Sequence, residues 1–263
     1  MKSFVRCSVL LSFDIEEFDM PLEYGKSLPL DEQIEISSRG TGIILDMLRK
    51  YEVHATFFST AVFATHATSV VHRLVNDGHE LASHGYFHSK FEDGHLLESK
   101  VTLERISGQR VNGFRMPRMM PVNDEAIQRS GYTYNSSMNP IFLPGRYNNF
   151  FKPRTIFHIN DTVQLPASVT PSLRFPLFWL SFHNVPLAVY KAACARTMER
   201  DKYLNIYFHP WEFTDLRDKK FGLPWYVSKN SGSQMIKRFE ELLKWMKEKK
   251  YHFSTINEYL RML

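Results

Sequence analysis

The chain has 263 residues, of which 43% are hydrophobic, and a formal net charge of +5. This composition allows a sizeable core, and no linker-like stretch interrupts it, so we expect a single domain over residues 1–263. The Lys and Arg residues are spread along the chain, which argues against a nucleic-acid partner. No stretch approaches the ~20 apolar residues of an integral membrane segment, and no signal-peptide pattern opens the chain. These two observations, together with the presence of only two isolated cysteines, predict a cytoplasmic location.

Predicted strands and helices alternate from end to end. We expect strands over residues 9–13, 53–59, 79–82, 111–114, 132–137, 162–165, 205–208 and 252–255. We expect helices over residues 40–48, 61–75, 96–107, 124–130, 187–200, 234–249 and 256–262, and a loop over residues 28–38. The helix at 96–107 is expected to turn Leu97, Val101 and Ile106 inward. The alternation predicts an α/β fold, either a parallel barrel or an open sheet.

A pair of histidines follows the third predicted strand, in the run Ser83-His84-Gly85-Tyr86-Phe87-His88. If this run forms a helix or a tight helical turn, the His84 and His88 side chains project from one face. Two imidazoles at that spacing suit one metal ion. The same spacing also occurs by chance in a chain with 11 histidines, so other residues must decide the question.

Three acids stand at the end of the first predicted strand, in the run Asp14-Ile15-Glu16-Glu17. In an extended chain Asp14 and Glu16 point to the same side and Glu17 to the other. An Arg-Met-Pro turn from Arg115 and a His-Pro-Trp-Glu run from His209 follow two further strands. Ligands gather where parallel strands end. We therefore expect these segments to meet at one rim of a barrel.

These segments, taken together, resemble the polysaccharide deacetylases of carbohydrate esterase family four, the NodB-type deacetylases. The resemblance rests on five motifs in the family's order, which cover most of the chain: residues 12–17, 78–88, 113–117, 131–137 and 207–213. It implies a distorted parallel (β/α) barrel with fewer than eight strands. It also implies a divalent metal, usually zinc, and a carbohydrate substrate that carries N-acetyl groups.

The resemblance also implies roles for individual residues. Asp14 would be the general base, and Arg115 would hold it ionised through a bidentate contact. His209 would protonate the leaving nitrogen.

The implied metal ligands are Glu16, His84 and His88. The spacing of the first acids looks like that of a subgroup with an acid-x-acid first motif, and Glu17 is the alternative acidic ligand.

Three further residues are predicted to bind substrate. We expect Arg118 to face an anionic group of the substrate, although a solvated arginine would look the same in the sequence. Trp211 is expected to contribute to a sugar-stacking surface with Phe221, Trp225 and Tyr226, unless these aromatics are ordinary packing. Tyr134, in the fourth motif, is the third predicted substrate-binding residue.

Three functions fit these expectations. The first is a metal-dependent hydrolase that removes N-acetyl groups from a sugar or a glycan precursor. The second is an amidohydrolase for a small non-sugar amide, such as a ureide, and the third is a catalytically weak sugar-binding protein. Metal binding separates them, because the first function needs an ion held by Glu16, His84 and His88.

Overall fold

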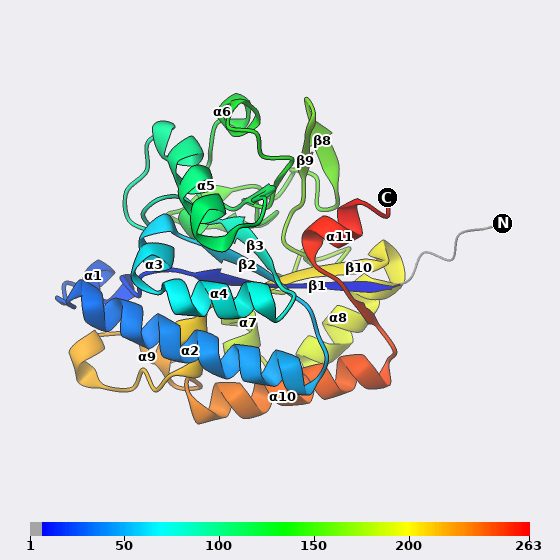
Figure 1. Cartoon of the computed structure of the whole chain (residues 1–263). Coiled ribbons are helices and arrows are strands. Elements are labelled where there is room, and N and C mark those ends of the chain that lie inside the picture. The colour runs from blue at the N-terminus through cyan, green and yellow to red at the C-terminus, as the bar shows by residue number, and fades with distance from the viewer. Residues whose placement is uncertain (1–6) are drawn as a thin grey trace.

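The computed structural model describes residues 7–263 and is organised around one curled, mostly parallel sheet (Figure 1). Its strand order is β10-β1-β2-β3-β4-β5-β9-β8, and β11 pairs with β1 off this path. The strands are β1 Ser8–Ile15, β2 Thr56–Ser59, β3 Glu80–Ser83, β4 Gly113–Phe114, β5 Tyr134–Asn135, β8 Phe157–Ile159, β9 Thr162–Gln164, β10 Tyr203–Phe208 and β11 His252–Phe253. Every pair in the sheet is parallel except β8 with β9.

The curled sheet forms an incomplete barrel. Seven parallel strands lie along the path from β10 to β9, and the antiparallel β8 ends it. The gap between β9 and β10 is bridged by an extended segment, in which the Ser168 amide donates to the Asn205 carbonyl at 2.8 Å. The predicted distorted parallel (β/α) barrel is therefore confirmed, with seven parallel strands along this path in a sheet of nine strands.

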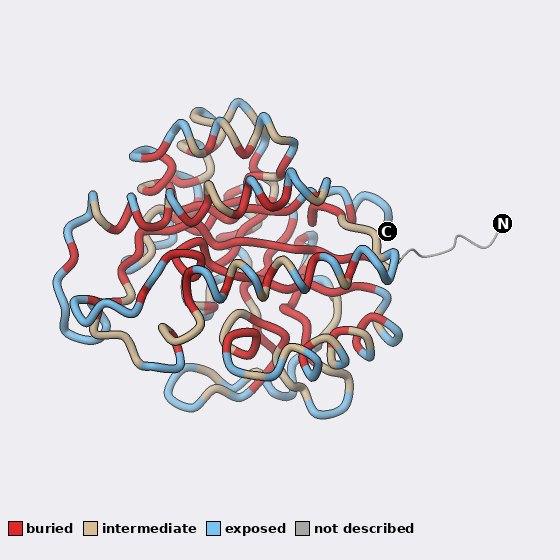
Figure 2. Tube along the Cα trace, turned by 90° about the horizontal axis from the view of Figure 1, so that it is seen from below, coloured by how far each residue is buried: buried red, intermediate tan, exposed pale blue. Residues whose placement is uncertain are grey.

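Alternation along β1 determines which side chains face the barrel interior. Val9, Leu11 and Phe13 pack into the large core between the sheet and the outer helices. Leu10 belongs to a separate interior cluster, so Asp14, four residues further along the same face, points inward. The sheet itself is buried almost throughout (Figure 2).

The helices are α1 Met20–Glu23, α2 Leu30–Lys50, α3 Ala61–His66, α4 Thr68–Asn76, α5 Gly94–Ser107, α6 Asp124–Arg129, α7 Trp179–Asn184, α8 Leu187–Asp201, α9 Trp225–Ser228, α10 Ser233–Glu248 and α11 Ile256–Leu260. The long helices α2, α5, α8 and α10 pack on the outer face of the sheet through the large core. In contrast, α11 contacts the interior cluster through Ile256 and Tyr259. A short antiparallel hairpin, β6 Phe142–Leu143 with β7 Tyr147–Asn148, stands apart from the sheet. In Figure 2 the outer helices show exposed residues toward solvent and buried residues toward the sheet.

The predicted loop at 28–38 was wrong, because α2 runs unbroken from Leu30 to Lys50. Gly40 lies inside this helix and was mistaken for a helix start. A Cβ atom at Gly40 would overlap the Pro210 carbonyl oxygen, so the glycine allows α2 to approach the turn that follows His209. Ile34, Ile44 and Leu48 supply the buried stripe of the long helix.

Two other expectations also failed. The helix predicted over 61–75 is divided at Ala67 into α3 and α4. In α5 the buried positions are Leu96, Ser99 and Leu103, whereas Leu97 and Val101 are 53% and 55% exposed. Of the three residues predicted to face inward, Ile106 does pack, partly buried, against the core.

No helix within residues 7–263 has both the length and the apolar character needed to cross a membrane. The single-domain organisation stays a prediction.

Candidate metal centre and active site

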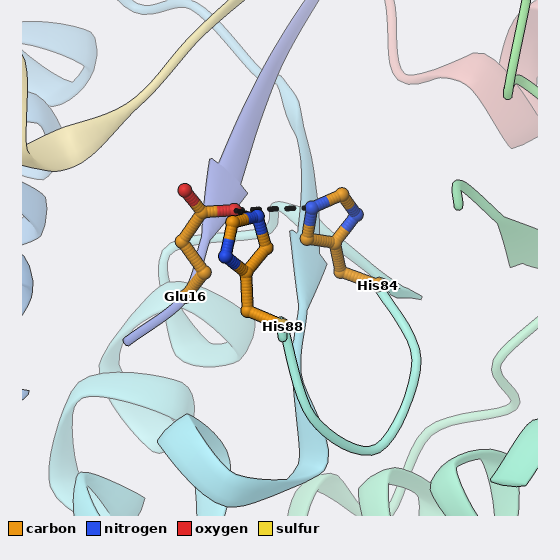
Figure 3. A group of neighbouring side chains, drawn as sticks. All are labelled: Glu16, His84 and His88. Atoms are coloured by element: carbon orange, nitrogen blue, oxygen red, sulfur yellow. Dashed lines mark hydrogen bonds and ion pairs between the residues drawn. The ribbon is translucent and has the colours of Figure 1, made fainter. Parts of the chain in front are cut away.

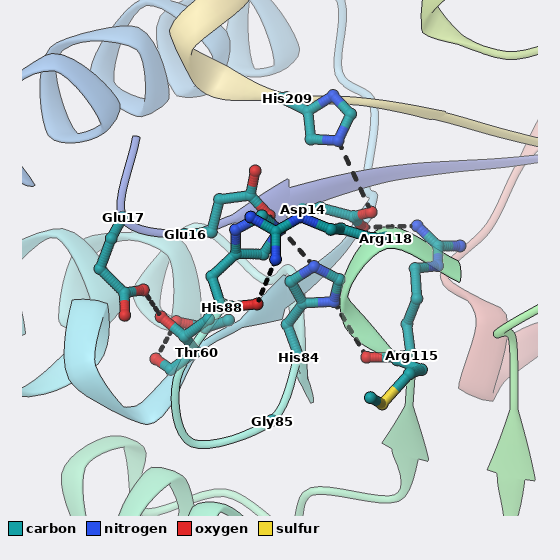
Figure 4. A network of polar contacts seen from close by, with 12 residues as sticks. Asp14, Glu16, Glu17, Thr60, His84, Gly85, His88, Arg115, Arg118 and His209 are labelled. Atoms are coloured by element: carbon teal, nitrogen blue, oxygen red, sulfur yellow. Dashed lines mark hydrogen bonds and ion pairs between the residues drawn. The ribbon is translucent and has the colours of Figure 1, made fainter. Parts of the chain in front are cut away.

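The predicted convergence at one rim is confirmed for the segments that follow β1, β3, β4 and β10 (Figure 4). Asp14 is the last residue but one of β1, and its neighbour across the sheet is Phe58 of β2. His84 comes directly after β3 and Arg115 directly after β4. His209 follows β10 and precedes a 3-10 turn over Pro210–Phe213.

Glu16, His84 and His88 form a tight cluster of possible ligand atoms (Figure 3). Glu16 Oε2 lies 3.1 Å from His84 Nε2 and 3.0 Å from His88 Nε2. One donor atom from each of the three residues lies within 4.8 Å of the others. The two histidines belong to a loop rather than to a helix, and Gly85 turns that loop with a φ of +83°. The helical turn considered for this run was therefore wrong, although the loop still brings both rings together.

The hydrogen bonds made by the Nδ1 atoms of His84 and His88 favour cation binding at the cluster. His84 Nδ1 lies 2.9 Å from the Arg115 carbonyl oxygen, and His88 Nδ1 lies 2.7 Å from Asp19 Oδ1. Both partners are pure acceptors, so each neutral ring donates from Nδ1 and presents the Nε2 lone pair to Glu16. Three lone-pair atoms then face one another, and a bound cation or an added proton must compensate them. The residues present thus fit a divalent ion with two His and one carboxylate ligand.

The pKa values of Glu16 and His88 are both strongly shifted from their usual values. Burial raises the pKa of Glu16, but His88 and the hydrogen bond with His84 outweigh it and bring the pKa well below its usual range. Burial lowers the pKa of His88, but Glu16 and Asp19 outweigh it and raise the pKa to about 9. The other oxygen of the Glu16 carboxylate, Oε1, accepts a hydrogen bond from Trp211 Nε1 at 3.2 Å. Glu16 is therefore held at both oxygens.

Asp19 is a site residue that the sequence analysis missed. Its carboxylate accepts from His88 and, through Oδ2, from Arg118 Nη2 at 3.1 Å. Arg118 also donates to Glu23 at 2.7 Å and has a φ of +56°, an unusual conformation for a residue with a side chain. The available signal was the acid-rich run from residue 14 to residue 19, of which only the first three acids were considered.

Glu17 points away from this cluster. Its carboxylate accepts a hydrogen bond from the Thr60 hydroxyl (Figure 4). Burial raises the pKa of Glu17. Glu16, and not the alternative Glu17, is the acid that the fold brings to the two histidines.

Asp14 and Arg115 form a buried ion pair beside the cluster. Arg115 Nη1 donates to Asp14 Oδ1 at 2.6 Å, while Arg115 Nη2 donates to the Ser136 hydroxyl at 3.1 Å. The guanidinium also lies 4.0 Å from the centroid of the Phe58 ring. The predicted bidentate contact with Asp14 is therefore wrong. Only Nη1 of Arg115 donates to Asp14, because Nη2 donates to Ser136, the residue that follows β5.

His209 lies near the other oxygen of the Asp14 carboxylate. His209 Nε2 lies 4.0 Å from Asp14 Oδ2, and His209 Nδ1 lies 3.0 Å from Glu212 Oε1. Glu212 Oε2 in turn lies 2.8 Å from His183 Nε2. Burial lowers the pKa of His209, but the hydrogen bond to Glu212 and the nearby carboxylates outweigh it and raise the pKa above its usual value. The geometry thus favours a protonated His209 oriented by Glu212.

A cavity of about 260 Å³ opens onto these residues. Asp14, Glu16 and His209 lie in its wall, and Arg118 and Trp211 line it as well. Arg118 is already paired with two carboxylates, so its charge is largely compensated. Trp211 is 1% exposed and stacks on His209 with ring centroids 4.6 Å apart.

The other predicted substrate-binding aromatics lie in different places. Tyr134 does not line the cavity: it is fully buried, and its hydroxyl donates to Glu80 Oε1 at 2.8 Å. Phe221 packs against Phe18 inside the protein. Tyr226 lines the cavity, whereas Trp225 is 68% exposed outside it. The four aromatics expected to stack on sugar therefore do not form one surface.

The comparison with protein families agrees with this geometry. The family model described as "Polysaccharide deacetylase" matches residues 8–134, the part that carries Asp14, Glu16, both histidines and Arg115. Over this part the chain is similar to the polysaccharide deacetylases. A peptidoglycan deacetylase of Helicobacter pylori is 26% identical to this protein over 104 residues, which are 36% of each chain. The chain matches only 25% and 36% of the lengths of its first curated relatives.

Solved structures support the fold over nearly the whole chain. A probable polysaccharide deacetylase from Pseudomonas aeruginosa PAO1 superposes with a TM-score of 0.67 at 15% identity, covering 98% of this chain and 91% of that one. PuuE allantoinase superposes with the same TM-score at 16% identity and the same coverage. At such low identity these likenesses establish the fold alone.

Proposed function

We propose that this protein is a metal-dependent hydrolase that removes N-acetyl groups from an amino sugar or a glycan precursor. The observation that carries the proposal is the convergence of Glu16, His84 and His88 beside the Asp14–Arg115 pair and His209. The match to the polysaccharide deacetylase family model over residues 8–134 and the similarity to a peptidoglycan deacetylase support it. A divalent ion, for which zinc is the first candidate, fits the ligand set of two His and one carboxylate.

The bound ion would supply Lewis-acid polarisation of the acyl carbonyl and would make water a stronger acid. Asp14 takes the proton of the attacking water at Oδ2, because Oδ1 is occupied by Arg115. Arg115 keeps that carboxylate in one orientation through its own contacts with Ser136. His209, whose Nε2 lies 4.0 Å from Asp14 Oδ2, delivers a proton from Nε2 to the leaving nitrogen, while Nδ1 stays bonded to Glu212.

The two alternative functions have less support. A ureide hydrolase shares the fold, as the likeness to PuuE allantoinase illustrates, but low identity transfers no activity. A weak sugar-binding protein would have no need of a buried acid, base and ligand set in one cavity. A cytoplasmic location stays a prediction.

The direct test is acetate release from N-acetylglucosamine oligomers, with allantoin as a competing substrate, after reconstitution with zinc. We expect turnover of the amino sugar that falls about 10²–10⁴-fold in Asp14→Asn, the usual effect of losing a general base. Asp93→Asn, at an exposed position, is the control and should keep full activity. Turnover of allantoin alone, or sugar binding without acetate release under any divalent metal, would contradict the proposal.

A further inference from the structure

A second depression adjoins the cavity described above. It is lined mainly by Ile141, Phe142, Phe150, Phe151, Leu173 and Phe178, and we call it the apolar groove. Its volume is about 540 Å³. Leu143 and Phe178 line both the apolar groove and the catalytic cavity, so the two spaces are adjacent.

The apolar groove offers few free hydrogen-bonding groups. Its polar lining side chains are Asn148 and Arg174. Arg174 Nη1 donates to the carbonyl oxygens of Pro140 and Lys152, at 3.2 and 2.9 Å. The guanidinium also lies 5.4 Å from the Phe150 ring centroid, and Asn148 Oδ1 accepts from the Phe150 amide. A glycan chain would leave its hydroxyl groups poorly satisfied in such a groove, whereas a hydrocarbon chain needs no partners.

The rim of the apolar groove is unusually exposed. Phe151 is 90% exposed and Leu173 is 84% exposed, the two highest values among the large apolar side chains that the structure describes. Phe142, on the β6–β7 hairpin, is 57% exposed. Large apolar side chains gathered at one place on a surface are a common sign of a binding site.

From these observations we propose that the apolar groove holds a hydrocarbon chain attached to the sugar that is deacetylated. The substrate class is thus an N-acetylated glycolipid or another amphipathic sugar derivative. This inference rests on the proposed deacetylase function, because the sugar must occupy the catalytic cavity while its chain occupies the groove. The chain would leave the sugar beside Leu143 and Phe178, which line both spaces.

The test compares octyl and methyl β-glycosides of N-acetylglucosamine, below the micelle concentration of the octyl compound. We expect kcat/KM for the octyl glycoside to exceed that for the methyl glycoside by about tenfold, the factor that burying about two methylene groups supplies. The Phe151→Ser, Leu173→Ser double variant should lose most of this preference and keep its kcat/KM on the methyl glycoside. Leu97→Ser, at an exposed position on α5, should retain the preference.

A binding measurement separates this inference from the proposed function. The dissociation constant of octyl β-glucoside, which has no acetyl group, is measured by calorimetry for the unmodified protein, the Phe151→Ser, Leu173→Ser double variant and Leu97→Ser. Binding that weakens only in the double variant supports the groove even if no glycoside is hydrolysed. Equal kcat/KM for the two glycosides, together with octyl glucoside binding that the variants do not change, would overturn it. So would dimerisation, or binding to phosphatidylcholine vesicles, that depends on Phe151 and Leu173 without any preference between the glycosides.

Discussion

The guanidinium of Arg115 and the carboxylate of Asp14 lie 2.6 Å apart, although 101 residues separate them in the chain. Both side chains are almost completely buried, with 0% and 4% of their surface exposed. The pair forms because β1 and β4 end at the same rim of the sheet. It places a charged carboxylate next to the candidate metal ligands without using that carboxylate as a ligand.

Arg115→Met should therefore be costly, because it leaves the Asp14 carboxylate buried without its partner. We expect a loss of about 3–5 kcal/mol in unfolding free energy, measured by urea denaturation. Adding Asp14→Asn should restore part of that stability while activity stays absent. Additive losses in the double variant would show that the two residues act independently.

Asp19→Asn should weaken metal binding without removing a ligand. The hydrogen bond from His88 Nδ1 to Asp19 fixes the ring, and loss of such an outer partner typically costs 10–100-fold in metal affinity. A competitive chelator titration with zinc measures the change. Glu23→Gln, which alters the other partner of Arg118 and leaves the contact between His88 and Asp19 in place, should change affinity far less. Equal losses would mean that orientation of His88 is not the cause.

Glu212→Gln should change the pH profile of the reaction. Glu212 raises the pKa of His209 against the effect of burial, and the active form of His209 is the protonated one. Activity is then lost as pH rises through this raised pKa. Removing the negative charge lowers the pKa of His209, so the alkaline limb of kcat must move to lower pH.

The control for this experiment is Glu125→Gln, at an exposed position of α6, which should leave the limb in place. Thermal melting at neutral pH checks that the buried substitution leaves the protein folded. An alkaline limb that does not move in Glu212→Gln would remove His209 from the role of acid.

Gly40 and Gly42 provide a matched pair within α2. Alanine in an exposed helix interior is normally favoured over glycine by about 0.8–1 kcal/mol, and Gly42→Ala, which would meet only the Arg73 side chain at 4.0 Å, should follow that rule. Gly40→Ala should do the opposite, since its Cβ would overlap the Pro210 carbonyl. We expect destabilisation by about 1–3 kcal/mol in thermal or urea unfolding. Stabilisation by both substitutions would contradict the close contact between α2 and the turn after His209.

Much of the site was predictable because strand periodicity is local. The alternation along residues 8–15 places Asp14 inside and separates Glu16 from Glu17, and apolar runs before His84, Arg115 and His209 mark strand ends. Every one of these inferences uses only neighbouring residues. The order of strands in the sheet then brings the segments together.

The features that were missed depend on distant contacts. Gly40 looked like a helix start, because the sequence does not show that Pro210 packs against it. Tyr134 looked like a substrate contact, but its partner is Glu80 from another strand. Asp19 contacts His88 only because the loop that carries His88 lies beside the segment that follows β1. Apart from the acid-rich run that ends at Asp19, these tertiary pairings leave no pattern in a single sequence.

The central claim is that Glu16, His84 and His88 hold one divalent ion. The most direct test is elemental analysis of the purified protein after zinc reconstitution and dialysis, beside a His84→Ala, His88→Ala variant and the exposed control His66→Ala. We expect close to one zinc per chain in the unmodified protein and in the control, and almost none in the double variant. An unmodified protein without metal, or a double variant that retains it, would contradict the account.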